Sequence, residues 1–285
     1  MDLTRVAIFT DSASDLDPEI AAAAGIGIIP LVVTFGKETF KAGVELSTAE
    51  FWARMTAADA PFPTTAASSP GDFKAAYEAA FAAGAEAIVS IHVAGTLSGT
   101  IKSAQIARDM LPDREIHLVD SQNASMAEGI LAQMGVELAA QGRSAAEIAE
   151  MLEARAGDTV SYLALETLEY LKKGGRISGA QAAIGTLLSL KPIIVVKEGV
   201  VATGDKVRTR SKARERLIEM IVQRPIERLV VLHTLSPDIE AFREDLLARI
   251  PGGPTFKDVP IALVGASVGP HLGPGCVGAV VMYRP

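Results

Sequence analysis

Short apolar runs alternate with helix-forming segments along the first half of the chain, and this alternation restricts the fold more than any other feature. The runs at 5–10, 86–93 and 115–120 are too short for helices and are typical of buried strands. Helix-start signals stand between them, as where Ser69 is followed by Pro70. Strands that alternate with helices predict a mainly parallel sheet with helices on both of its faces.

Capping signals predict where several further helices begin. Three segments combine a capping side chain with a suitable partner: Asp17 with Pro18, Ser47 with Glu50, and Ser144 with Glu147. Additional helices are expected at about 99–111 and 125–141. The apolar run 26–35 is interpreted as a strand in which Pro30 indicates either an edge position or an interruption.

The rhythm changes after residue 158. A strand at 159–165 precedes a basic segment, a helix of small residues at 179–189, and two paired strands that turn near Gly199. The remaining pattern predicts helices at 211–223 and 237–249 and strands at 228–234, 259–265 and 277–283. We therefore expect an α/β protein of two α/β domains, residues 1–158 and 159–285, each a sheet flanked by helices.

Charge and composition argue against several classes of protein. A net charge of −7 disfavours a nucleic-acid partner, and the single cysteine, Cys276, excludes an internal disulfide and a thiolate metal cluster. The apolar run near the N-terminus is too short for a signal peptide, and no run approaches the 18 apolar residues of a membrane span. The expectation is a cytoplasmic protein without stable membrane insertion.

A segment rich in glycine and hydroxyl groups, HVAGTLSGTIKSAQ, follows the strand at 86–93 and opens a helix. Ligands of open α/β sheets bind beyond the carboxyl ends of the strands, where a helix N-terminus favours an anion. The segment is neither a P-loop nor a nucleophile elbow around Ser98. Ser98 and Gly99 are therefore candidates for binding an anion. Thr65 is expected in a loop before a capped helix, where threonine commonly only satisfies helix amides.

His271 stands between two Gly-Pro pairs in GPHLGPG. The glycines and prolines fix the backbone around an imidazole that donates a hydrogen bond or changes protonation near neutral pH. No second histidine, cysteine or carboxylate stands at metal-ligand spacing, so no metal site is expected. His92, His117 and His233 lie in strand-like apolar runs and are interpreted as structural.

Two basic segments remain open to more than one interpretation. LKKGGRIS, which contains Arg176, is either a helix C-terminus or a basic loop near an anionic ligand or a partner protein. KVRTRSKARER at 206–216 alternates basic residues as on the solvated face of a strand, and the alternative is a patch that docks a partner.

Eight stretches in order resemble the DegV family, the bacterial fatty-acid-binding proteins that supply a fatty acid kinase. They span essentially the whole chain: TDSASDL, PTTAASSPGDF, GTLSGTIKSA, VDSQNASMAEG, LEYLKKGGRIS, LLSLKPII, VRTRSKA and GPHLGPG. The resemblance implies a fatty acid between the two domains, with its tail in an apolar tunnel that we assign to 159–285. The carboxylate would be held by Thr65, Ser98, Gly99 and His271. Arg176 is similar to the family's basic residue near the head group, with partner docking as the alternative.

The resemblance further implies a carrier with no catalytic residue and no cofactor, whose bound fatty acid is phosphorylated by an ATP-dependent kinase. One departure is that Ala66 and Ala67 follow Thr65, where the family commonly has Ser-Gln. Two alternatives stay open. One is an acyl hydrolase that uses Ser98 and His271. The other is a lipid-responsive regulatory module, which is supported only by the basic run 206–216.

Overall fold

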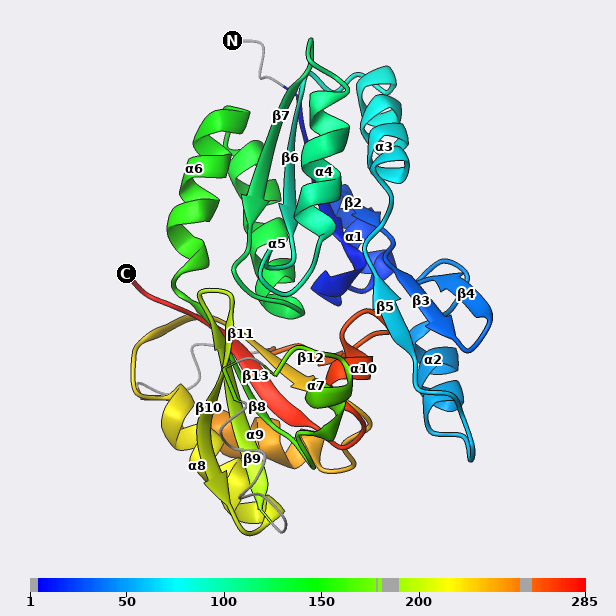
Figure 1. The fold of residues 1–285 in the computed structure, drawn as a ribbon. Helices are drawn as coiled ribbons and strands as arrows, with labels where there is room; N and C mark the ends of the chain where they lie inside the picture. Colours follow the sequence, from blue (N-terminus) through cyan, green and yellow to red (C-terminus); the bar gives the residue numbers. More distant parts are fainter. Residues whose placement is uncertain (1–4, 178, 181–189, 252–257) are drawn as a thin grey trace.

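The computed structural model describes residues 5–177, 179–180, 190–251 and 258–285 (Figure 1). The first half of the chain forms a parallel four-stranded sheet in the order β2-β1-β6-β7. Its strands are β1 (Val6–Asp11), β2 (Ile26–Ile29), β6 (Ala87–His92) and β7 (Glu115–Asp120). The parallel sheet expected from the strand–helix alternation is confirmed.

Helices cover both faces of this sheet. On one face lie α3 (Pro70–Ala82) and α4 (Thr100–Asp109), which bury Phe73 and Tyr77 against the strands. On the other lie α5 (Met126–Ala140) and α6 (Ala145–Ala156), while α1 (Pro18–Ala24) packs beside β2. The predicted caps are present: Asp17 caps α1, and Ser47, Ser69 and Ser144 form capping boxes. Each side chain accepts a hydrogen bond from a backbone amide that the helix leaves unpaired.

A small antiparallel sheet, in the order β4-β3-β5, branches off where Pro30 interrupts the apolar run. It consists of β3 (Val32–Phe35), β4 (Glu38–Lys41) and β5 (Thr64–Ala66), with α2 (Thr48–Met55) packed beside it. The Trp52 indole donates a hydrogen bond to the Val264 carbonyl at 2.8 Å, which ties α2 to the second half of the chain. The expectation of a loop at Thr65 is wrong, because Thr65 lies on β5 and pairs with Val33.

The second half forms a six-stranded sheet in the order β10-β9-β8-β13-β11-β12, antiparallel except for the β11–β12 pair. Its strands are β8 (Thr159–Ala164), β9 (Lys191–Lys197), β10 (Val200–Val207), β11 (Ile226–His233), β12 (Ile261–Leu263) and β13 (Val277–Tyr283). The paired strands expected around Gly199 are confirmed as β9 and β10. Most of the predicted helix 179–189 lies outside the described residues.

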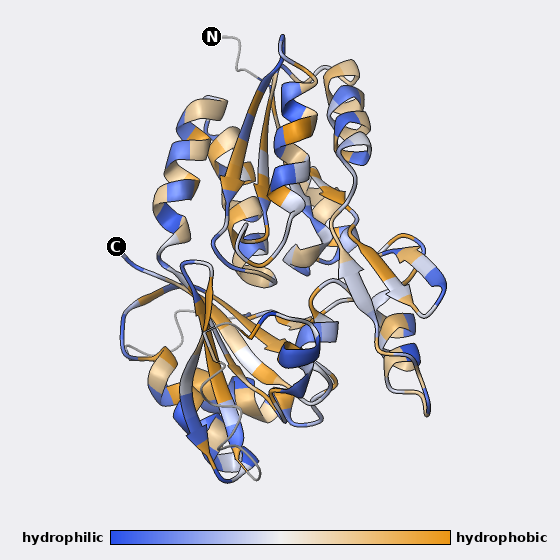
Figure 2. Cartoon of the chain, in the orientation of Figure 1, coloured by the Kyte–Doolittle hydropathy of each residue, from blue (hydrophilic) through white to orange (hydrophobic). Residues whose placement is uncertain are grey.

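The six-stranded sheet is covered by α8 (Arg210–Ile221) and α9 (Ile239–Arg249) on one face, and by α5 from the first half on the other. One apolar cluster therefore runs from Ile130 on α5 to Leu163 and Val280 on the second sheet. Figure 2 shows the hydrophobic residues concentrated along the strands of both sheets. Because this core is shared by the two halves, a domain boundary at residue 158 stays a prediction.

Candidate functional site

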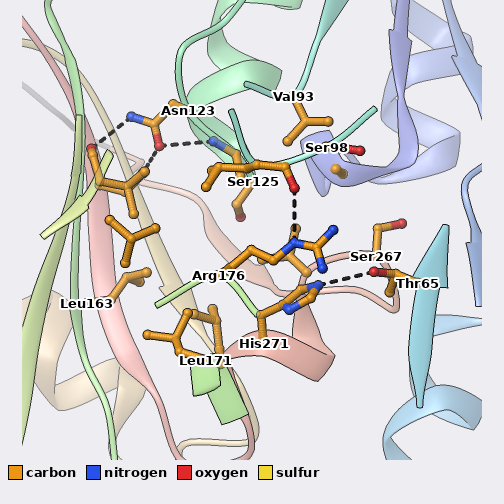
Figure 3. Close-up of a pocket in the computed structure, with 18 of the residues that line it drawn as sticks. Thr65, Val93, Ser98, Asn123, Ser125, Leu163, Leu171, Arg176, Ser267 and His271 are labelled. Atoms are coloured by element: carbon orange, nitrogen blue, oxygen red, sulfur yellow. Dashed lines mark hydrogen bonds between the residues drawn. The ribbon is translucent and has the colours of Figure 1, made fainter. Parts of the chain in front are cut away.

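A pocket opens between the two halves of the chain, and both halves contribute to its wall (Figure 3). Its apolar side chains include Leu31, Val93 and Leu97 from the first half and Leu163, Val196 and Leu232 from the second. Thr65, Ser98, Arg176 and His271 also line it. The pocket thus combines an extensive apolar wall with a small group of polar side chains, a composition typical of small-molecule sites.

The predicted site residues come from four distant segments. Thr65 lies on β5, Ser98 precedes α4, Arg176 follows α7 (Glu169–Lys173), and His271 lies on the short helix α10 (Gly269–Leu272). Gly99 is the exception, because it is exposed at the N-cap of α4 and is not part of the pocket wall.

His271 is bonded to Thr65, with 3.1 Å between its Nε2 and the Thr65 Oγ1. Burial, together with a smaller effect of the nearby positive charge of Arg176, lowers the pKa of His271 to about 4. The imidazole is therefore neutral at pH 7. Its Nδ1 is buried and has no hydrogen-bond partner within the part of the chain that the structure describes.

Two glycine-containing segments, LKKGGRIS and GPHLGPG, pack closely against each other at His271. The His271 ring packs on Gly174, where a Cβ would lie 2.1 Å from Nδ1, and the Tyr170 ring packs equally closely on Gly273. Gly174 is also the C-cap of α7, so LKKGGRIS begins as a helix C-terminus and then carries Arg176 to the pocket. The sequence left the interpretation of LKKGGRIS open, and in the structure its double glycine fixes the position of the imidazole.

Replacing Gly174 by alanine is expected to displace His271, because no real Cβ tolerates a heavy atom at 2.1 Å. The bond between Thr65 and His271 should be lost while the fold persists. A two-dimensional NMR spectrum of the histidine side chains, recorded with Gly175→Ala as a second variant, checks this. Gly175 has nothing within 4 Å of a Cβ but a φ of +71°, so its change reports backbone strain alone. An unchanged His271 signal in Gly174→Ala would contradict the expected displacement.

Arg176 links the two halves at the pocket. Its Nε donates to the Leu97 carbonyl at 3.0 Å and its Nη1 donates to the Gly174 carbonyl at 2.6 Å. Leu97 directly precedes Ser98, so the guanidinium lies beside both the α4 loop and the His271 helix. Arginine in this position supplies a positive charge and directional donors for an anionic group.

Ser98 is not arranged as a nucleophile. Its Oγ pairs with the Thr100 Oγ1 at 2.7 Å, and the bonding partner of His271 is Thr65 instead. A serine–histidine relay needs a group that orients the imidazole, and among the described residues no carboxylate bonds to His271 Nδ1. The geometry does not favour the acyl hydrolase that the sequence left open.

The basic run at 206–216 is largely engaged in ion pairs within the second half. Arg210 opens α8, not the strand we expected, and pairs with Glu166 and Asp238. Its guanidinium holds the pKa of Asp238 well below the usual range. Arg214 and Arg216 also form ion pairs with carboxylates. These contacts weaken the interpretation of the run as a docking patch.

One polar residue that follows β7, Asn123, was not assigned to the site from the sequence. Asn123 lines the pocket and donates from Nδ2 to the Thr159 and Val196 carbonyls, at 3.2 and 3.0 Å. Its Oδ1 accepts from the Ser161 hydroxyl at 2.8 Å. The rule that placed a ligand beyond β6 applies equally to β7 and was the signal that could have identified Asn123.

His92 is fully buried, in agreement with the structural role expected for it. Its Nδ1 lies 3.1 Å from the Asp11 carboxylate and its Nε2 lies 2.9 Å from the Ser90 hydroxyl, which also accepts from Tyr77. Ser90, His92 and Asp11 are all inaccessible to solvent. The cluster therefore fixes the ends of β1 and β6 and has no surface from which a substrate could approach.

Residues 5–284 match the family model described as an uncharacterised protein of the DegV family. The chain belongs to the DegV family. A DegV domain-containing protein of Streptomyces coelicolor is 36% identical, over 98% of this chain and 99% of its own length. The DegV protein of Bacillus subtilis is 31% identical, over 98% of this chain and 100% of its own length.

Solved structures show the DegV fold as well. A DegV family protein from Thermus thermophilus, described by its fatty acid binding, superposes with a TM-score of 0.89 at 33% identity, covering 98% of this chain and 100% of that one. DegV from Bacillus subtilis, described as a fatty acid binding protein, gives a TM-score of 0.86 at 31% identity, with 99% and 100% covered. Within the described ranges of this DegV protein, no helix is long and apolar enough to cross a bilayer.

Proposed function

We propose that this DegV family protein binds a long-chain fatty acid in the pocket between its two halves. The observation that carries the proposal is the union of an apolar wall with Thr65, Ser98, Arg176 and His271 in one pocket. The fatty-acid binding described for two relatives above 30% identity supports it. In this assignment, the acyl tail contacts the apolar side chains and the carboxylate meets the polar group.

The acyl tail and the head group contribute differently to the free energy of binding. Burial of an acyl chain contributes about 0.8 kcal/mol per methylene, so a chain of roughly 14–16 carbons gains on the order of 10 kcal/mol before binding costs. A carboxylate that leaves water costs several kcal/mol unless donors meet it. The hydroxyls of Thr65 and Ser98, the neutral ring of His271 and the guanidinium of Arg176 are such donors. The tail then supplies most of the affinity and the head-group contacts fix the orientation.

We further propose that the protein is a carrier that presents the carboxylate to an ATP-dependent fatty acid kinase in the cytoplasm. In that reaction a carboxylate oxygen attacks the γ-phosphorus of ATP, an acyl phosphate forms and ADP leaves. The attacking oxygen belongs to the ligand, so this chain needs no nucleophile of its own. Arg176 would offset the added negative charge, and the carrier would retain the acyl-phosphate product.

Mass spectrometry under denaturing conditions tests fatty-acid binding. The purified protein is expected to release a fatty acid in about a one-to-one ratio, because the apolar pocket retains its ligand. Protein that is consistently free of fatty acid and also fails to bind added palmitate or oleate would refute the proposal. The kinase step is tested separately, by adding ATP and a purified fatty acid kinase and trapping the acyl phosphate with hydroxylamine. No hydroxamate from loaded protein would leave binding intact and remove the carrier role.

A further inference from the structure

A second hollow, here called the groove, lies between the two halves of the chain beside α1. Its cavity volume is about 730 Å³. Its wall includes β12 of the second sheet and Ile26 and Ile28 of β2 in the first, and these two strands are the outer strands of their sheets. The groove is distinct from the fatty-acid pocket, because the two hollows share no wall residue.

The free edge of β12 faces the groove. Ile261, Ala262 and Leu263 all line it, although successive side chains of a strand point to opposite faces of a sheet. Side chains from both faces border one hollow where that hollow lies along the edge of the strand. The other edge of β12 pairs with β11.

Backbone groups along this free edge lack a strand partner. The Pro260 carbonyl and the Val264 amide bond to β11, at 2.9 Å each. In a parallel ladder alternate residues bond to the same neighbour, so the amides and carbonyls of Ile261 and Leu263 point away from β11. Within the described ranges, these four groups form no hydrogen bond. They are available to pair with an extended chain that lies beside β12.

A contact at one end of this edge supports the direction in which it points. Gly265 follows Leu263 in the same alternation, and its amide donates to the Asp15 carboxylate at 2.8 Å. Asp15 belongs to the first half of the chain and lines the groove. At the other end stands Pro260, which has no amide. An edge this short resists indiscriminate strand pairing, so an occupant must also fit the groove by its side chains.

Apolar side chains of the groove wall reach the surface of the molecule. Ile20 on α1 is 58% exposed and Val44 is 71% exposed, and both line the groove. The apolar side chains of Ile26 and Ile28 continue the wall inward. Exposed apolar side chains that gather at one hollow indicate a site where another molecule binds.

Charge at the groove disfavours an anionic ligand. In the described chain the charged wall residues are Asp15 and Asp17, and no lysine, arginine or histidine lines the groove. Burial raises the pKa of Asp15 to about 7 although two hydrogen-bond donors contact its carboxyl group, so the main negative charge of the wall is that of the exposed Asp17. A further exposed acid, Asp258, precedes β12. A fatty acid or a phosphate ester is repelled here, whereas a lysine or arginine side chain is attracted.

We propose that the groove binds an extended segment of a partner protein, which adds a strand to β12, buries apolar side chains against Ile20 and Val44, and places a lysine or arginine beside Asp17. Main-chain bonds to Ile261 and Leu263 hold this segment, and its alternate side chains give specificity. Since the groove and the fatty-acid pocket share no wall residue, this binding site goes beyond the proposed function and does not depend on it.

Selection from a phage library of random dodecapeptides tests the proposal. We expect the wild-type protein to enrich peptides that alternate apolar with other residues and contain a lysine or arginine. Val44→Asp should bind them about tenfold more weakly, because it places a charge in the apolar wall, and Ile20→Asp should act in the same way. Ile106→Asp is the matched control. Ile106 is 53% exposed on α4 and does not line the groove, so this variant should bind as wild type does.

Amide hydrogen exchange with the tightest-binding peptide tests strand addition. The amides of Ile261 and Leu263 should exchange about tenfold more slowly in the complex, while the Val264 amide, which already bonds to β11, should change little. Two forms of the peptide, N-methylated on alternate amides in opposite phase, give a second control, because only one phase removes the donors that face β12. We expect one form to lose binding and the other to keep it. Equal binding of both forms would overturn strand addition.

The charge of Asp17 is tested with Asp17→Asn, since asparagine keeps the cap of α1. This variant should bind a lysine-containing peptide about threefold more weakly. Enrichment of acidic peptides, or of none that distinguishes wild type from Val44→Asp, would overturn the inference. Palmitate binding at two sites per chain, with one site lost in Val44→Asp, would overturn it as well and identify the groove as a lipid site.

Discussion

The Val201→Trp variant is expected to purify almost free of fatty acid and to bind added palmitate about a hundredfold more weakly than wild type. Val201 lies on β10, is 3% exposed and faces the pocket opposite its strand partner Val196. An indole at this position occupies room that three or four methylenes would otherwise fill. At about 0.8 kcal/mol per methylene, the loss is about 3 kcal/mol, which corresponds to the expected hundredfold.

A matched control comes from the adjacent residue of the same strand. Val200 is 49% exposed, because successive side chains of a strand point to opposite faces. Val200→Trp should therefore bind palmitate as wild type does. Isothermal titration and thermal unfolding of both variants make the comparison. Full affinity in a folded Val201→Trp protein would show that the fatty acid does not occupy this pocket.

His271→Ala should reduce acyl-phosphate formation far more than it reduces fatty-acid affinity. The change removes a neutral donor and leaves the Thr65 hydroxyl without its partner at 3.1 Å. Loss of a donor aimed at a reacting group commonly costs about a hundredfold in rate. Affinity should fall by less than about fivefold, because the tail dominates binding.

This comparison needs loaded protein, ATP and a fatty acid kinase, with palmitate affinity measured in parallel. His117→Ala is the matched control, since His117 bonds to Glu115 on β7 and does not line the pocket. It should leave both quantities near wild type. Equal losses of rate and affinity in His271→Ala would contradict the division between tail and head group.

Local structure was predictable because its causes are local. The side chains of Ser69 and Ser144 bond within a few residues of themselves, so Pro70 after Ser69 and Glu147 three residues after Ser144 already indicate two helix starts. An interruption at Pro30 was likewise one of the two expected outcomes. The parallel first sheet followed from the order of strands and helices, because parallel strands need a crossover between them.

The residues of the site were identifiable by type, but their contacts were not. Thr65 and His271 are 206 residues apart, and they meet because β5 pairs with β3 while α10 packs against α7. Nothing near GPHLGPG shows that Gly174 receives the imidazole. Ser125 looked like an ordinary helix start, and its strained backbone, with φ 59° and ψ −149°, arises from contacts with Ala13 and Asp15.

The sequence by itself determined the strand and helix order of the parallel sheet, the helix caps and the chemical groups available to bind an anion, since these depend on near neighbours and on residue type. Only the tertiary structure decided which of those groups share a pocket, because that depends on how distant segments pack. It also decided the ionisation of His271 and Asp15, since burial and nearby charge set the pKa of both.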